Sequence, residues 1–292
     1  MATPENPLLT ELRACADNLC AKRGWTLIKA LGAGASAAVF EIATDDGVRA
    51  LKVYAPRFLS GTLGRTTRQR FDIVVRNLLD HDCPNLVRCY EGDEIDGALY
   101  MVMERVPGSC LTDVLSTVPR SEVRSILTQV AAAAKYLEDR RLCHRDIKCD
   151  NIVVSSDYKK ATLLDLGVIR WVDSEDGAGT DEDGQLPFVA TARYSSPEYM
   201  FRLVPSSPEL WRALTFYQLG GVLHDLINRQ LMFEDVVQRS SQNRYLIAYS
   251  VATRIPVVRL EPEVDTDLVL LARRALQKDH TVRLASVAWL IF

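Results

Sequence analysis

The stretch HRDIKCDN, residues 144–151, places an acid, a lysine and an amide at short, regular spacing. It follows an apolar helix-like run and leads into an apolar triplet, so we expect a loop held between a helix and a short strand. In phosphoryl transfer, a carboxylate such as Asp146 accepts a hydroxyl proton, an ammonium such as Lys148 neutralises phosphate charge, and an amide oxygen such as that of Asn151 binds magnesium. A charged surface loop is the alternative interpretation, since these residue types are common in turns.

Composition sets broad limits on the class of protein. The chain has 292 residues, a formal net charge of -3 and a hydrophobic fraction of 48%, which is ordinary for a globular protein with a sizeable core. This charge gives no global signal for nucleic acid or for an acidic membrane surface. The seven cysteines are scattered without C-x-x-C spacing, which favours reduced thiols and a cytoplasmic location. No secretory signal pattern and no membrane-spanning apolar run is visible, so we expect no membrane insertion.

Periodicity gives a coarse order of elements. A helical stripe covers residues 7–22 and strands are expected across residues 25–53. A second amphipathic helix is predicted over residues 65–79. A strand over residues 99–104 then runs into a Pro-Gly break, where we place a domain boundary. The pattern of residues 121–142 predicts a long amphipathic helix, with Ser121 as its N-cap, that leads into the loop at 144–151.

Two motifs lie in the first part of the chain. Gly32 and Gly34 stand close together after a strand, and glycines allow backbone N–H groups to approach a phosphate without a Cβ in the way. Lys52 lies inside the apolar run ALKV at residues 50–53, where a lysine is costly unless it has a partner. A plain hairpin turn is the alternative interpretation of the two glycines, and phosphate oxygens would supply the partner that Lys52 needs.

Further motifs follow the catalytic stretch in order. Asp165-Leu166-Gly167 ends a short apolar strand, and residues 191–199 read TARYSSPEY. Arg283 lies near the C-terminus in the run ALQKDHTVRL, residues 275–284. Taken together over residues 25–290, these motifs resemble the protein kinase superfamily, specifically the catalytic domain of serine/threonine protein kinases.

The resemblance implies an α+β, bilobal protein-kinase-like fold: a small antiparallel β-sheet lobe with one helix, then a larger, mostly helical lobe. It implies an N-terminal helical extension at residues 1–24, an N-lobe at 25–106 and a C-lobe at 107–292. ATP and Mg²⁺ would bind in the cleft of that fold, and the partner would be a protein substrate of unknown identity, with no nucleic acid. Arg283 would form an ion pair with Glu198.

The resemblance also implies a role for each matching residue. Asp146 would act as the base and Lys148 would offset the charge of the transferring group, with Thr191 completing the floor for a Ser or Thr acceptor. Asn151 and Asp165 would hold Mg²⁺. Lys52 would position the α and β phosphates of ATP. The residues expected around the nucleotide are Gly32, Gly34, Val39, Ala50, Lys52, Met103 as gatekeeper, Glu104, Val106 and Val153.

Three positions depart from the family pattern. The helix glutamate that should pair with Lys52 falls at Val74 or Val75, and the third loop glycine is Ala37. The family aspartate that ties down the catalytic loop aligns with Thr215, whose hydroxyl would hold the loop amides less strongly. A pseudokinase, which binds partners or nucleotide without catalysis, is therefore the main alternative. A small-molecule kinase fits less well, because such enzymes lack the segment that ends at Glu198. Val168, a β-branched residue after Asp165-Leu166-Gly167, leads us to expect Thr over Ser as the acceptor.

Overall fold

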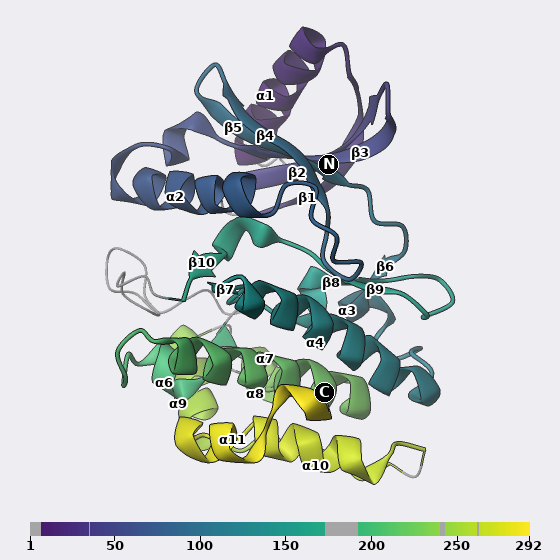
Figure 1. Cartoon of the computed structure of the whole chain (residues 1–292), viewed down its shortest axis with the longest axis vertical. Coiled ribbons are helices and arrows are strands. Elements are labelled where there is room, and N and C mark those ends of the chain that lie inside the picture. The colour runs from purple at the N-terminus through teal and green to yellow at the C-terminus, as the bar shows by residue number, and fades with distance from the viewer. Residues whose placement is uncertain (1–6, 35, 173–191, 240–242, 262) are drawn as a thin grey trace. The chain divides into compact units, whose positions relative to one another are not determined.

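A computed structural model of the chain describes residues 7–34, 36–172, 192–239, 243–261 and 263–292. The chain divides into two compact units by its internal contacts. The first unit comprises Met1–Asp82 and Val87–Val106, and the second comprises Cys83–Leu86 and Pro107–Phe292. Figure 1 shows a sheet in the first unit and mainly helices in the second.

The first unit is built on a five-stranded antiparallel sheet with the strand order β1-β2-β3-β5-β4. Hairpins join β1 to β2, β2 to β3 and β4 to β5, because only a few residues separate the two strands of each pair. Its strands are β1 (Thr26–Ala33), β2 (Ala37–Thr44), β3 (Gly47–Tyr54), β4 (Cys89–Ile95) and β5 (Ala98–Glu104).

The two faces of this sheet have different partners. One face packs against α1 (Pro7–Arg23), whose Leu12 and Ala16 are fully buried against the inward residues of β2, β3 and β5. Successive residues of a strand point to opposite faces, so Leu51 and Val53 lie in this core while Ala50 and Lys52 belong to the other face. On β3, Tyr54 makes an edge-to-face contact with Phe71 of α2 (Gly61–Asn77).

The second unit is organised around α7 (Pro208–Asn228). Ser207 caps it by accepting from the Leu210 N–H, and its residues from Leu210 to Ile227 are nearly all buried. It contacts α4 (Val123–Asp139) and α10 (Thr266–Ala275). A Cβ on Gly220 would lie 2.6 Å from the Cβ of Ala275, so glycine allows α7 and α10 to approach closely.

Short elements complete this unit. A three-stranded sheet in the order β6-β8-β9 and a two-stranded β10-β7 pair frame the loop at 144–151. These strands are β6 (Ser109–Cys110), β7 (Leu142–Cys143), β8 (Ile152–Val154), β9 (Ala161–Leu163) and β10 (Arg170–Trp171). The other α-helices in the described part of the unit are α3 (Leu111–Val114), α6 (Pro197–Met200), α8 (Glu234–Arg239), α9 (Arg244–Thr253) and α11 (His280–Ser286).

The α+β class expected from the sequence is confirmed, with two differences in the helices. The helix expected at 65–79 begins earlier, at Gly61, and ends at Asn77. The helix expected from Ser121 begins at Val123 after a 3-10 turn (Arg120–Glu122), and its N-cap residue is Glu122, without a side-chain cap. Ser121 as N-cap was therefore wrong, because the tight preceding turn shifts the helix start. Among the described residues, no helix has the length and apolarity needed to span a bilayer.

Candidate active site

The loop at residues 144–151 brings three predicted side chains together in the second unit. It runs from β7 to β8 and closes with a 3-10 turn, Cys149–Asn151. The Asp146 Oδ2 atom lies 2.8 Å from Lys148 Nζ and accepts from Asn151 Nδ2 at 3.0 Å. The other oxygen, Asp146 Oδ1, is buried and has no hydrogen-bond partner within the described part of the chain. One carboxylate oxygen is thus held in place, while the second remains an acceptor for an incoming donor.

Asn151 and Asp165, the two residues predicted to hold Mg²⁺, carry side-chain oxygen atoms and lie near each other along the backbone. The Asn151 Nδ2 group donates to the Asp146 carbonyl at 2.8 Å and to its carboxylate, which uses both amide hydrogens and directs the Asn151 amide oxygen to other ligands. The Leu164 N–H donates to the Asn151 carbonyl at 2.7 Å. Asp165 is the next residue in the chain, so this backbone bond holds it near Asn151. Amide and carboxylate oxygens are ligands that Mg²⁺ prefers, so these residues fit the ion.

Few protein ligands are available for such an ion. Among the described residues, no group of three or more His, Cys, Asp or Glu side chains could hold a metal. Magnesium in phosphoryl-transfer sites commonly binds one or two protein carboxylates and takes its remaining ligands from phosphates and water. Asp165 itself has a left-handed backbone (φ 55°), and its side chain accepts from the Gly167 N–H at 3.1 Å. This bond orients the Asp165 carboxylate and helps to stabilise a backbone conformation that residues other than glycine rarely adopt.

His144 is a buried support of the same loop. Its Nε2 atom bonds the Leu164 carbonyl at 2.8 Å, and its Nδ1 atom accepts from the Asp146 N–H at 3.3 Å. These two bonds require the neutral ring with its proton on Nε2. Burial lowers the pKa of His144 and favours this neutral form.

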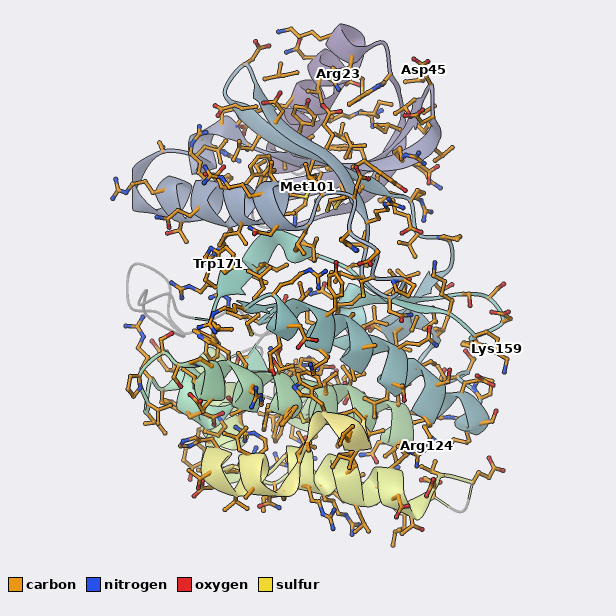
Figure 2. The ribbon with its side chains drawn as sticks, in the orientation of Figure 1. Arg23, Asp45, Met101, Arg124, Lys159 and Trp171 are labelled. Carbon is orange, nitrogen blue, oxygen red and sulfur yellow. The ribbon has the colours of Figure 1, made fainter. Side chains whose placement is uncertain are left out.

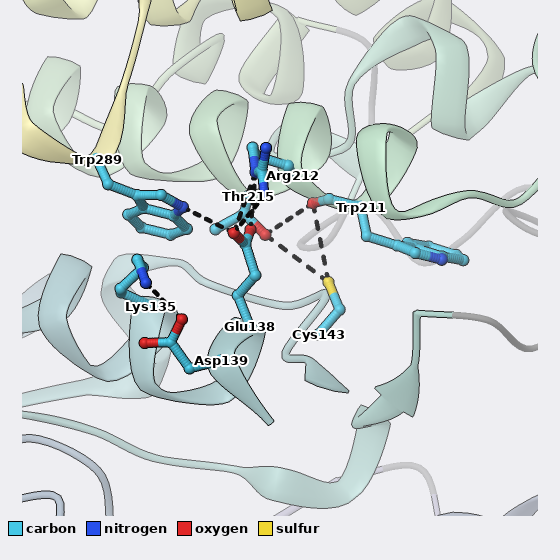
Figure 3. A network of polar contacts seen from close by, with 8 residues as sticks. All are labelled: Lys135, Glu138, Asp139, Cys143, Trp211, Arg212, Thr215 and Trp289. Atoms are coloured by element: carbon cyan, nitrogen blue, oxygen red, sulfur yellow. Dashed lines mark hydrogen bonds and ion pairs between the residues drawn. The ribbon is translucent and has the colours of Figure 1, made fainter. Parts of the chain in front are cut away.

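Thr215 does not take the place of the family aspartate. Its Oγ1 donates to the Trp211 carbonyl within its own helix at 2.8 Å and lies 3.7 Å from the Cys143 sulfur (Figure 3). Gln218, one helical turn later on α7, makes the contacts with the catalytic loop: its Nε2 donates to the Arg145 carbonyl at 2.6 Å and its Oε1 accepts from the Ile147 N–H at 3.2 Å. The expectation for Thr215 was wrong because a hydroxyl in a helix readily bonds the carbonyl four residues earlier.

The predicted Glu198–Arg283 ion pair is confirmed. Arg283 is fully buried, its Nη2 bonds Glu198 Oε1, and its Nε donates to the Ala213 carbonyl of α7 at 2.9 Å. Glu198 is the second residue of α6 and lies within the motif at residues 191–199. Thr191 and the rest of residues 173–191 lie outside the described residues.

Five of the predicted nucleotide residues of the first unit lie on one face of its sheet: Gly32, Val39, Ala50, Lys52 and Met103. Strand register places Gly32 opposite Val39, Val39 opposite Lys52 and Lys52 opposite Met101, so these four form a row across β1, β2, β3 and β5. Figure 2 labels Met101 on its strand. A Cβ on Gly32 would meet no atom within 4 Å, so the backbone there is open to a ligand. The Gly34 N–H closes the hairpin by donating to the Ala37 carbonyl at 2.8 Å.

A second row of the same face holds the predicted gatekeeper. Ala50 pairs with Met103 across β3 and β5, and both side chains are buried. The Glu104 N–H donates to the Arg88 carbonyl at 2.8 Å, which anchors the end of β5 within the sheet. Beyond it, the Arg105 Nη1 donates to the Val106 carbonyl at 2.6 Å, which holds the segment that follows β5. In the second unit, Val153 lies on β8 between Cys110 and Thr162.

Helix α2 contains no glutamate that could pair with Lys52. Val74 is only 1% exposed and packs as an apolar residue. Asp72, the nearest acid, is exposed to solvent. The Lys52 Nζ atom lies 5.3 Å from the centre of the Tyr54 ring, a cation–π contact on its own strand.

Sequence patterns missed two parts of the site. Gln218 carries no motif signal, because an amide in an apolar helix is indistinguishable from any buried polar residue until its partners are known. A buried network around Asp225 was also missed: its Oδ2 accepts from the Tyr194 hydroxyl and lies 3.7 Å from Cys149 Sγ, and its Oδ1 bonds His224 Nδ1 at 2.8 Å. Burial raises the pKa of Asp225, and this network ties α7 to the catalytic loop and to the segment before α6.

Comparisons with known proteins all match this chain to protein kinases. The sequence model described as "Protein kinase domain" matches residues 25–290. Serine/threonine-protein kinase pkn2 of Myxococcus xanthus is 28% identical over 221 residues, covering 74% of this chain and 25% of that protein. PknF of Mycobacterium tuberculosis is 27% identical over 190 residues, covering 61% and 38%. PknI of the same species is 30% identical over 182 residues, covering 58% and 31%. The chain therefore spans about a quarter to two fifths of the length of these curated relatives.

Proposed function

The chain belongs to the protein kinase family, and we propose that it transfers the γ-phosphoryl group of ATP to a Ser or Thr hydroxyl of a protein. The observation that carries this proposal is the arrangement of Asp146, with one carboxylate oxygen held by Lys148 and Asn151 and the other buried without a partner in the described residues. The relatives named as serine/threonine-protein kinases support the same acceptor class.

The proposed step uses the chain's own groups in simple roles. The hydroxyl oxygen of the substrate forms a bond to the γ phosphorus as the bond from that phosphorus to the β–γ bridging oxygen breaks, and ADP leaves with the electron pair. Asp146 Oδ1 orients the hydroxyl and accepts its proton. Lys148, 2.8 Å from the same carboxylate, offsets negative charge on the transferring group. Mg²⁺ held by Asn151 and Asp165 would neutralise charge on the ATP phosphates.

The first unit is proposed to hold the nucleotide. Lys52 would contact the α and β phosphates, beneath the hairpin that carries Gly32 and Gly34, and Val39 would pack on the adenine. Met103 and Ala50 would bound the base, and the backbones of Glu104 and Val106 would bond it. Val153 of the second unit is proposed as a further apolar contact. The shared sheet face and the register of these strands support the proposal.

Thr191 stays part of the proposal as a partner of Lys148 in the acceptor floor, although it lies outside the described residues. A Ser or Thr hydroxyl lies close to its backbone, whereas a tyrosine hydroxyl lies several ångström further out and needs a shallower platform. Val168, after Asp165-Leu166-Gly167, supports a preference for Thr over Ser. A cytoplasmic location also remains a prediction; all seven cysteines lie within the described residues, and none of them forms a disulfide.

A pseudokinase is the second candidate, and the buried Val74 is the observation that favours it.

If Asp72 replaced the missing glutamate, Asp72→Ala would lower kcat/KM for ATP nearly as much as Lys52→Met does. The exposure of Asp72 leads us to expect the opposite, with only Lys52→Met impaired. Equal losses in the two variants would assign Asp72 as the anchor of Lys52.

The direct test is transfer of labelled phosphate from Mg-ATP to three matched peptides that differ only in a Ser, Thr or Tyr acceptor. We expect transfer to Thr and, more weakly, to Ser, with none to Tyr. One methyl group gives discrimination of ~1–3 kcal/mol at most, so the Thr preference should be modest. Efficient Tyr phosphorylation would overturn the acceptor class, and equal or better use of Ser would overturn the preference.

A further inference from the structure

We propose that Gln218 is the positioning residue that fixes the backbone on both sides of Asp146, in the place of the aspartate that the family pattern would put at Thr215. The inference rests on the proposed function, because it assigns Gln218 a role in the same reaction. Gln218 is fully buried on α7 and bonds the loop through both ends of its amide.

The four polar atoms of the two peptide groups that flank Asp146 are all bonded. In the peptide group between Arg145 and Asp146, the carbonyl accepts from Gln218 Nε2 and the N–H donates to His144 Nδ1. In the group between Asp146 and Ile147, the carbonyl accepts from Asn151 Nδ2 and the N–H donates to Gln218 Oε1. His144 and Asn151 belong to the loop itself. Gln218 supplies the two bonds from a separate element, 71 and 73 residues away in sequence.

The loop needs such an anchor because Arg145 has a left-handed backbone with φ 69°. A residue with a Cβ is strained in this region, and it stays there only when its surroundings hold it. The Arg145 carbonyl bond to Gln218 holds the peptide after this residue, and the Arg145 Nε bond to the Val168 carbonyl at 2.7 Å holds its side chain. Without the first bond, the Arg145–Asp146 peptide group keeps only its N–H bond to His144, at 3.3 Å, and rotates more easily toward an unstrained conformation, which moves the Asp146 carboxylate.

A glutamine is suited to this place by its chemistry. Its amide offers a donor and an acceptor at one end of a side chain, and the two loop atoms require one of each. A carboxylate could accept from Ile147 but could not donate to the Arg145 carbonyl. Since α7 is buried along nearly its whole length, the amide is presented from a rigid element. Thr215 is excluded from the role by its bond to Trp211.

The first test compares Gln218→Met, which keeps the length of the side chain and removes both bonds, with Thr215→Val on the same helix. We expect Gln218→Met to lower kcat for peptide phosphorylation by about 10- to 100-fold, the size of effect that a small misplacement of a reacting group produces, with KM for ATP nearly unchanged. Thr215→Val should retain a kcat close to that of the wild type. A wild-type kcat in Gln218→Met, or equal losses in both variants, would overturn the inference.

The second measurement does not depend on activity. Amide hydrogen exchange at Ile147 should be faster in Gln218→Met than in the wild type and unchanged in Thr215→Val. In Gln218→Glu the acceptor remains, so Ile147 should stay protected while kcat falls through the lost donor to Arg145. An Ile147 amide that exchanges equally in Gln218→Met and the wild type would overturn the inference even if the wild type transfers no phosphate. If the Ile147 amide exchanges slowly in the wild type and faster in Gln218→Met, but the wild type transfers no phosphate, the result would contradict the proposed function alone.

Discussion

The Lys148 ammonium lies 2.8 Å from the Asp146 carboxylate, and both side chains are close to nine-tenths buried (11% and 12% exposed). A charge pair with so little solvent interacts more strongly than a surface pair, because the local dielectric screens it less. The pair therefore fixes the position of the acid before any substrate arrives.

The first prediction concerns Lys148. Lys148→Met should lower kcat by about 10²–10³-fold, because a preorganised charge near the transferring group is lost. Lys159→Met is the matched control: the Lys159 side chain is 66% exposed and its ammonium pairs with the buried carboxylate of Glu122. Figure 2 labels Lys159 at the edge of the second unit. Steady-state peptide phosphorylation measures both. Equal kcat values in the two variants would contradict the role of Lys148.

The second prediction concerns magnesium. Asp165→Asn should raise the Mg²⁺ concentration needed for half-maximal transfer, because a neutral amide binds a hard dication more weakly than a carboxylate. Asp157→Asn, in the exposed turn between β8 and β9, should leave it unchanged. A magnesium titration at saturating ATP gives the values. An unshifted midpoint in Asp165→Asn would remove Asp165 from the metal site.

The third prediction concerns the stability of the second unit. Arg283→Met leaves Glu198 buried without its partner and should lower the free energy of unfolding by about 3–5 kcal/mol. The control is Arg124→Met, which breaks a pair with Asp265 whose side chains are about half exposed and should cost less than about 1 kcal/mol. Figure 2 labels Arg124. Denaturant unfolding measures the free energy of unfolding of both variants. A loss in Arg283→Met as small as that in Arg124→Met would show that the buried pair is dispensable.

The fourth prediction concerns Lys278, whose Nζ donates to the Tyr217 hydroxyl at 2.9 Å near the Phe233 ring. Burial, with the Arg283 charge nearby, lowers the pKa of Lys278 to about 7. An unfolded lysine has a pKa of about 10.4, so between these values the unfolded chain binds a proton that the folded chain lacks, and stability rises with pH. Below pH 7 the folded chain carries the full cost of the buried charge.

Lys278→Met should therefore be more stable than the wild type at pH 6, on the order of 1–3 kcal/mol, with the difference shrinking as pH rises from 7 toward 10. Lys278→Arg is the control, since guanidinium stays protonated throughout this range and should give no such convergence with the methionine variant. Urea unfolding at several pH values measures the differences. A methionine-minus-wild-type difference independent of pH would contradict the lowered pKa.

The parts of the site that sequence predicted are those built from short-range spacing. Asp146, Lys148 and Asn151 lie within six residues, and a loop closed by one 3-10 turn keeps side chains at such spacing together. The strand row Gly32–Val39–Lys52 was foreseeable for the same reason, because hairpins pair nearby residues. Glu198 and Arg283 are far apart in sequence, and only the resemblance to a family joined them.

The parts that sequence did not predict depend on long-range contacts or on competition between local bonds. Gln218 meets Arg145 across 73 residues, and nothing in its own neighbourhood marks that contact. Thr215 was misassigned because alignment takes no account of the carbonyl of Trp211, one helical turn away. Ser121 was misassigned because the 3-10 turn before α4 displaces the cap position.

The most direct measurement of the central claim is labelled-phosphate transfer from Mg-ATP by the wild type, Asp146→Asn and Asp150→Asn. Asp150 lies in the same loop with an exposed side chain, so its variant controls for loss of a negative charge there. Asp146→Asn should lower kcat by about 10²–10⁴-fold, the range for loss of a general base, with ATP binding retained, and Asp150→Asn should remain near the wild type. Equal transfer by Asp146→Asn and the wild type, or a wild type that binds Mg-ATP and transfers nothing, would contradict the account.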